Sequence, residues 1–228
     1  FTACLDDLLG TDHEPILAEL SEKYPDVQFR HCKMNPISLD SKLPPGVTLQ
    51  MNMYSLLEKS TEQKNTVNLI GINTVAKNGD LRDILAQKGY RLLHISEYDG
   101  FEDFREMSSS KLDILAGPAA KMASKDMEKN LGIPTVEGYV TYREQDIDAF
   151  YTRLSEALGE NLLPLTAPYR DKARQKIAEA KAVIGDYPIA VDYQAVLRPF
   201  SLALMLAENG FRVAMVASDG IPAFEQEN

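Results

Sequence analysis

Two cysteines and three histidines are the rarest side chains of this chain among those that could bind a metal ion or act as nucleophiles. Cys4 and Cys32 do not form a Cys-x-x-Cys pair, and His13, His31 and His94 are isolated from one another in the sequence. The phosphate-binding, dinucleotide-binding, zinc-protease and nucleophile-elbow motifs are all missing. The simplest interpretation of each histidine is therefore a packed or solvent-exposed side chain and not a catalytic one. A buried strand thiol is the simplest interpretation of Cys32.

A more specific candidate site lies where apolar runs end in glycine. Gly71 and Asn73 follow one such run, and Gly117 and Pro118 follow another. In open α/β sheets, ligands bind at the carboxyl ends of the strands, where helix N-termini favour anionic groups. We therefore predict that these four residues bind a cofactor or ligand. The alternative is that they form simple packing turns.

The stretch Lys111 to Tyr139 indicates the elements that position Gly117. Leu112 to Ala116 has the length and composition of a buried strand, and Gly117-Pro118 is typical of a turn into a helix. Apolar residues then recur at helical spacing up to Leu131, and Gly132 is placed to end the helix in a left-handed conformation. A second strand is predicted from Thr135 to Val140. Strands joined through such a helix are expected to be parallel.

The same alternation continues on both sides of this stretch and predicts an α/β fold. The expected fold is Rossmann-like, with doubly wound, mainly parallel sheets and helices on both faces. Before the central stretch we expect a helix from Thr11 or Asp12 to about Tyr24 that buries Ile16, Leu17 and Leu20, strands at Val27 to Cys32, Val67 to Ile72 and Tyr90 to Ile95, and a helix at Asp80 to Lys88. After it we expect helices around Ile147 to Leu158, at Asp171 to Ile184 with one apolar stripe, and at Val196 to Asn209, with strands at Ile189 to Asp192 and Phe211 to Ala217.

Polar loops divide this series into three predicted domains. Residues 1–64 would be the C-terminal part of a first Rossmann-like domain, residues 65–161 a second, and residues 162–228 the start of a third, incomplete one. The chain has no initiator methionine and its first residues read as the end of a strand. We therefore expect it to be a piece of a longer chain.

Composition limits the classes of partner. The formal net charge of -10 argues against nucleic acid or an anionic membrane as the main partner, because both require a basic surface. No apolar run reaches membrane-spanning length. Two cysteines are too few for a disulfide scaffold, which favours the reducing cytoplasm.

Three stretches resemble the nitrogenase component 1 type oxidoreductases, a family that includes the nitrogenase molybdenum-iron protein chains. FTACLDDLLGTDHEPILAEL is similar to the family segment in which a cysteine and an apolar turn precede Gly-Asp-Asp and a helix; Cys4, Gly10 and Asp12 keep that spacing, and Thr11 replaces the first acid. MEKNLGIPTVEGY resembles a helix that ends in Tyr-Gly-Ile-Pro before a strand. NLIGINTVAKNGDLRDILAQKGYRLLHIS resembles a strand, glycine turn, helix and strand of the family.

The resemblance implies an oxidoreductase subunit that holds an iron–sulfur cluster. It also implies pairing with a related component 1 subunit, as a homo- or hetero-oligomer, and electron delivery by an ATP-dependent iron protein. Cys4 falls where the family has a cysteine ligand of the cluster that accepts those electrons. The fragment alone is expected to be inactive.

Two departures from the family pattern change the expected chemistry. The cysteine that holds the family's catalytic cofactor follows the central strand, where this chain has Gly117. The family's substrate-pocket histidine would lie near Leu49 to Tyr54, which includes Gln50 and Asn52 but no histidine. We therefore do not expect a molybdenum cofactor. We expect instead a nitrogenase-like reductase that acts on another substrate. The alternative is a redox-silent scaffold that binds a small molecule or a metal cofactor.

Overall fold

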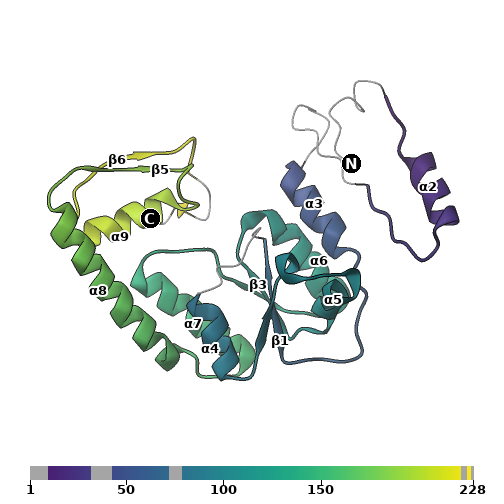
Figure 1. Cartoon of the computed structure of the whole chain (residues 1–228), viewed down its shortest axis with the longest axis horizontal. Helices are drawn as coiled ribbons and strands as arrows, with labels where there is room; N and C mark the ends of the chain where they lie inside the picture. The colour runs from purple at the N-terminus through teal and green to yellow at the C-terminus, as the bar shows by residue number, and fades with distance from the viewer. Residues whose placement is uncertain (1–9, 32–42, 72–78, 222–224, 227–228) are drawn as a thin grey trace. The chain divides into compact units, whose positions relative to one another are not determined.

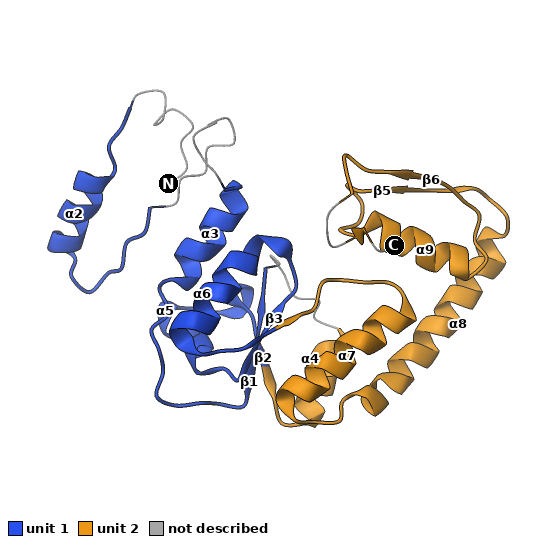
Figure 2. Cartoon of the chain, turned by 180° about the vertical axis from the view of Figure 1, so that it is seen from behind, with its two compact units in different colours: residues 1–75, 92–135 blue, residues 76–91, 136–228 orange. Residues whose placement is uncertain are grey.

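The computed structural model describes residues 10–31, 43–71, 79–221 and 225–226 (Figure 1). The chain divides into two compact units, one of residues 1–75 and 92–135 and the other of residues 76–91 and 136–228 (Figure 2). In the described part of the chain, no helix has both the length and the apolar character needed to cross a membrane.

A four-stranded sheet is the centre of the fold, and its strands follow the order β2-β1-β3-β4. The bounds of these strands are β1 Thr66–Ile70, β2 Arg91–Leu93, β3 Leu112–Leu115 and β4 Thr135–Glu137. β1 and β3 are parallel, in a register that pairs Val67 with Leu112 and Ile70 with Leu115. Every residue of both strands is buried, as expected for the inner strands of a parallel sheet. The predicted α/β Rossmann-like class is confirmed.

The strand order places a topological switch point between β1 and β3. From β1 the chain first adds β2 on one side, and it then crosses to add β3 and β4 on the other side. In doubly wound sheets, the carboxyl ends of the two strands at such a point border the usual ligand-binding crevice. Gly71 follows β1 and Gly117 follows β3 closely, so both predicted glycines lie at this point.

In the first unit, the central strand–helix–strand prediction is confirmed with small shifts. The helix begins with the 3-10 turn η3 (Pro118–Ala120) and continues as α6 (Lys121–Leu131), which buries Ala123, Met127 and Leu131. Gly132 ends it with φ 80°, the left-handed conformation that glycine adopts most easily. The other described helices of this unit are α2 (Glu14–Lys23), α3 (Pro45–Tyr54), η1 (Ile95–Glu97), α5 (Phe101–Arg105) and η2 (Glu106–Ser109), and α3 packs against α6.

Two predictions near the N-terminus are wrong. Helix α2 (Glu14–Lys23) forms, but it buries no residue, and the side chain of Ile16 is 47% exposed. The predicted strand at Val27 to Cys32 is absent from Val27 to His31, and Cys32 lies outside the described residues. A β-branched and aromatic pattern makes a strand only where a neighbouring strand can pair with it. None of the described strands pairs with this segment.

The second unit contains two sets of elements. α4 (Asp80–Gln87) and α7 (Glu144–Leu158) pack against η4 (Leu163–Thr166), and α7 buries Tyr151 and Leu154. β5 (Ile189–Asp192) and β6 (Val213–Ala217) are parallel and pack against α9 (Pro199–Glu208). Helix α8 (Ala167–Ile184) connects the two sets. Its predicted apolar stripe is not a buried face, because α8 buries no residue.

Candidate functional site

The carboxyl ends of β1 and β3 touch through their backbones at Gly71 and Gly117. A methyl group added to Gly117 would lie 2.0 Å from the Gly71 carbonyl oxygen, and one added to Gly71 would lie 2.5 Å from the Gly117 oxygen. Gly71 also has φ 89°, which other residues adopt only with strain. The backbone N–H of Ala116 donates to the Ile70 oxygen just before this contact, at 2.8 Å. Both positions therefore require glycine for packing, whatever they bind.

The structure brings together three of the four residues predicted to bind a ligand. Gly71 and Gly117 are in contact, and Pro118 opens η3 immediately after Gly117. The predicted ligand Asn73 lies outside the described residues, as does the predicted metal ligand Cys4. Ligand binding at this edge of the sheet stays a prediction.

A buried polar network lies between the same two strands. Asn68 of β1 donates from Nδ2 to Asp113 Oδ1 of β3 at 2.7 Å and to the Met107 oxygen at 2.9 Å. Ser110 donates to Asn68 Oδ1 at 2.8 Å, and its hydroxyl is 2.9 Å from that of Thr66. This network holds β1 and β3 in register, because each side chain has partners only in this alignment.

Asp113 is the only carboxylate in that network. Its side chain is fully buried, and its Oδ2 has no hydrogen-bond partner among the described residues. Burial raises the pKa of Asp113 from 3.8 to about 7, although the hydrogen bond from Asn68 acts in the opposite direction. Glu128 on α6 raises this pKa further. The carboxyl group is therefore expected to titrate near neutral pH and not near pH 3.8.

A second cluster of buried charge lies at the start of α9 in the second unit. Glu225 has a fully buried side chain, and its Oε1 accepts the backbone N–H of Ser201 at 3.1 Å in the first turn of α9. The same oxygen is 3.7 Å from Nε of Arg198, whose side chain is 12% exposed. A carboxylate at a helix N-terminus is stabilised by the N–H groups there. Glu225 Oε2 has no hydrogen-bond partner among the described residues.

The neighbours of this cluster come from the segment before α7. Arg198 Nη1 donates to the Val140 oxygen at 3.3 Å. The hydroxyl of Ser201 accepts the N–H of Tyr142 at 3.3 Å and is 3.1 Å from the hydroxyl of Thr141. Together these contacts place a guanidinium, a carboxylate and a helix N-terminus after the carboxyl end of β5, which is the position where α/β folds bind ligands.

The sequence analysis missed Arg198 because it started this helix at Val196. The helix starts at Pro199, since proline fits the first helical position and disfavours helical backbone at the residue before it. The available signal was an Arg-Pro pair at the head of an otherwise apolar segment. Glu225 gave no signal, because its contact with Ser201 joins residues distant in sequence.

A cleft of about 690 Å³ also lies within the second unit, and ion pairs line it. Arg143, before α7, holds Glu208 of α9 with two hydrogen bonds of 2.7 and 3.2 Å. Arg170 of α8 pairs with Asp148 of α7 and lies 3.4 Å from Glu144. The guanidinium groups of Arg143 and Arg170 are therefore already paired with carboxylates and are not directed at a bound anion.

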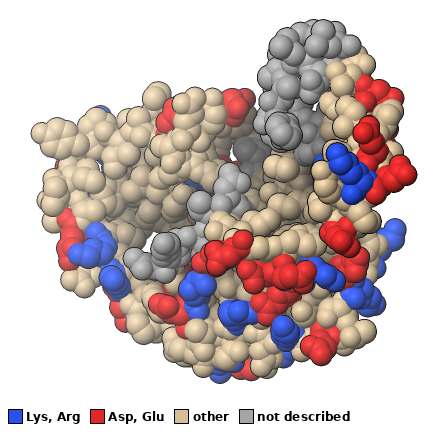
Figure 3. Space-filling model, turned by 45° about the vertical axis from the view of Figure 1, so that its right-hand side comes forward, with Lys and Arg blue, Asp and Glu red and all other residues tan. Residues whose placement is uncertain are grey.

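The described residues contain no group of three or more His, Cys, Asp or Glu side chains arranged to hold a metal ion. Both cysteines lie outside these residues. On the face drawn in Figure 3, acidic patches are interspersed with basic side chains. That distribution agrees with the net charge of -10.

Comparison with known proteins gave one family and a set of similar folds. The model of the family described as nitrogenase component 1 type oxidoreductase matches residues 1–227. A solved structure of nitrogenase Cp1 at pH 6.5 matches 93% of this chain with a TM-score of 0.66 and 17% sequence identity. The chain spans 52% of that protein, about half of its length. No curated protein matches the chain.

Proposed function

Because this chain belongs to the nitrogenase component 1 type oxidoreductase family, we propose that it is part of a subunit that carries electrons to a substrate or cofactor. The family match over residues 1–227 is the observation that carries this proposal. The subunit would hold an iron–sulfur cluster, and the electrons would pass to a site at a domain or subunit interface.

Cys4 is the proposed cluster ligand of this chain. Clusters of two or four irons normally take four thiolates, whereas this chain has two cysteines and Cys32 has no cluster motif around it. The described residues supply no alternative set of three ligands. The remaining ligands would therefore come from outside these 228 residues, from a longer form of the chain or from a related subunit.

A molybdenum cofactor bound through position 117 does not fit this structure. The first side-chain carbon of a cysteine there would lie 2.0 Å from the Gly71 carbonyl oxygen, so the ends of β1 and β3 would have to separate. We therefore propose a different electron acceptor, bound near Gly71, Asn73, Gly117 and Pro118. Its identity would be set by residues around these strand ends.

Within the second unit, Arg198 is a separate candidate for contact with an anionic ligand. The guanidinium group of Arg198 and the backbone N–H of Ser201 at the start of α9 both approach Oε1 of Glu225, and both groups attract anions. Glu225 neutralises them here. A ligand with a carboxylate or a similar anionic group would compete with Glu225 for this position.

The proposed setting follows from the family assignment. The subunit would work in the cytoplasm with a related component 1 subunit and an ATP-dependent iron protein as the electron donor. Residues 1–64, 65–161 and 162–228 would contribute to three Rossmann-like domains of the complete protein. The alternative function is a redox-silent relative that binds a small molecule or a metal cofactor. It is favoured by the tight Gly71–Gly117 contact, because packing alone is enough to explain both glycines.

Iron binding separates the two functions. Anaerobic treatment with iron and sulfide should leave the 228-residue chain colourless, because it lacks enough thiolates. A longer form of the chain, together with its related subunit, should turn brown under the same conditions. Bound iron and the electron paramagnetic resonance signal of the reduced sample would be measured.

The matched variants are Cys4→Ala and Cys32→Ala in that complex. Cys4→Ala should lower the iron content strongly, and Cys32→Ala should leave it nearly unchanged. Equal iron retention in the two variants would exclude Cys4 as a ligand and favour the redox-silent alternative.

A further inference from the structure

We propose that His13 and His31 form a binding site for a divalent transition metal such as Zn²⁺, which fastens the start of α2 to the segment that leads toward α3. Their imidazole rings lie with centroids 4.5 Å apart, tilted by 45°. The two residues are far apart in sequence but belong to the same compact unit. The proposal uses only these two histidines and does not rest on Cys4 or on an iron–sulfur cluster.

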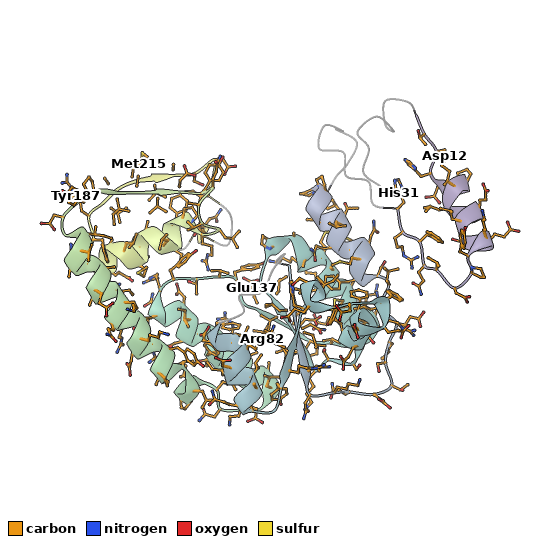
Figure 4. The ribbon with its side chains drawn as sticks, viewed as in Figure 1. Asp12, His31, Arg82, Glu137, Tyr187 and Met215 are labelled. Carbon is orange, nitrogen blue, oxygen red and sulfur yellow. The ribbon has the colours of Figure 1, made fainter. Side chains whose placement is uncertain are left out.

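Each histidine is held by its backbone on a different element. The His13 oxygen accepts the N–H of Leu17 at 3.0 Å, so this residue is fixed at the head of α2. The His31 oxygen accepts Nδ2 of Asn52 at 2.8 Å, and Asn52 belongs to α3. Figure 4 labels His31 and also Asp12, the neighbour of His13, and it shows the two segments that carry the pair.

The ring separation suits two ligands of one metal ion. Neutral imidazole is the commonest metal ligand in proteins, and Zn–N bonds of about 2.0–2.1 Å in a tetrahedral site place two nitrogens about 3.3 Å apart. The ring centroids are 4.5 Å apart, so the proposal requires only side-chain rotation to bring one nitrogen of each ring to that separation. Water would complete the coordination, since the described residues offer no third ligand of the usual types.

The surroundings supply the reason for such a link. α2 has 10 residues and buries none of them, and the side chain of its N-cap residue His13 makes no capping hydrogen bond, although Asp12 Oδ1 accepts the N–H of Glu14 at 3.1 Å. An isolated helix of that length is marginal in water. The segment from Val27 to His31 makes no strand pairing either. A metal bound by both imidazoles would stabilise the folded arrangement of α2, because it binds that arrangement and not the unfolded one.

Zn²⁺ binding to the 228-residue chain tests the proposal. Cys4 and Cys32 would first be replaced by serine, because thiolates bind the same metal and Cys32 directly follows His31. Competition with a coloured chelator measures the affinity, and hydrogen exchange of the α2 amides measures the effect on the helix. The variants His13→Asn and His31→Asn each remove one ligand, and Glu19→Gln on the exposed surface of α2 is the control.

The expected result is one Zn²⁺ per chain, an affinity at least about tenfold weaker in each histidine variant, and no change in Glu19→Gln. Zn²⁺ should slow hydrogen exchange of α2 in the parent chain and not in the histidine variants. The proposal is overturned if the parent chain binds no Zn²⁺, or if the histidine variants bind it as tightly as the parent. Binding without slower exchange of α2 would equally overturn the fastening role.

Discussion

Gly71 and Gly117 leave no room for a side chain between the ends of β1 and β3. Gly117→Ala should therefore lower the free energy of unfolding by about 1–3 kcal/mol, because the new methyl group would meet a backbone oxygen that moves only with its strand. The φ of Gly117 is -148°, an extended value, so the loss would be steric. Chemical denaturation measures it.

The matched control is Gly100→Ala. Gly100 also precedes a helix with extended backbone, and an added methyl group would meet nothing within 4 Å. Its effect should stay within about 0.5 kcal/mol. Equal losses in the two variants would contradict the close approach of β1 and β3.

The carboxyl group of Asp113 should make stability depend on pH. Its pKa is raised from 3.8 to about 7 in the folded chain, so its stabilising effect is complete below about pH 4 and is lost as pH rises through 7. The neighbouring groups that shift the pKa of Asp113 are Asn68 on β1, which lowers it, and Glu128 on α6, which raises it. Asp113 in turn adds to the effect of burial in raising the pKa of Tyr54 on α3. Asp113→Asn should gain stability relative to the parent chain between pH 5 and pH 8.

Thermal unfolding at several pH values measures this difference, and Asp126→Asn on the exposed side of α6 is the control. The control should follow the parent chain at every pH. If Asp113→Asn shows the same offset at pH 5 and pH 8, the carboxyl group does not titrate in the core.

At the scale of elements, helix α8 depends on ion pairs because it buries no residue. Arg170 pairs with Asp148 of α7, and their side chains are 27% and 32% exposed. A double-mutant cycle of Arg170→Ala and Asp148→Ala should give a coupling energy of about 1 kcal/mol, reduced at high salt by screening.

The exposed pair Lys176–Glu179 within α8 serves as the reference, with side chains 64% and 49% exposed. Its cycle should give less than about 0.5 kcal/mol. A coupling energy for Arg170 and Asp148 no larger than this reference would mean that apolar contacts, and not ion pairs, hold α8.

At the scale of the whole molecule, the two sheets should differ in local stability. β1 and β3 are buried throughout, whereas β5 and β6 form a two-stranded sheet in which only Val191 is buried. Two strands alone are marginal in water, and local opening is easiest where few apolar groups are buried. Hydrogen exchange followed by mass spectrometry should therefore show slow exchange in β1 and β3 and fast exchange in β5 and β6. Similar rates in both sheets would contradict this ranking.

The sequence by itself determined the elements that depend on local signals. α6 and its end at Gly132, the buried strands β1 and β3, and the strand–helix–strand order of β5, α9 and β6 all follow from apolar periodicity and from glycine and proline. The family followed as well, because its motifs keep their order along the chain, and the match over residues 1–227 confirms it. Of the candidate site, the sequence placed Gly71, Gly117 and Pro118 at strand ends.

Only the tertiary structure decided which of these residues meet. The contact of Gly71 with Gly117 depends on β3 lying beside β1, and the contact of Glu225 with Ser201 joins residues with no common local pattern. The tertiary structure also decided which apolar side chains are buried. The apolar positions of α2 predicted a buried face, yet a periodic stripe only makes burial favourable, and another surface must cover it. Contacts between distant residues carry no local signal in a single sequence, so the pairing of strands, the raised pKa of Asp113 and the contacts of Arg198 emerged only from the fold.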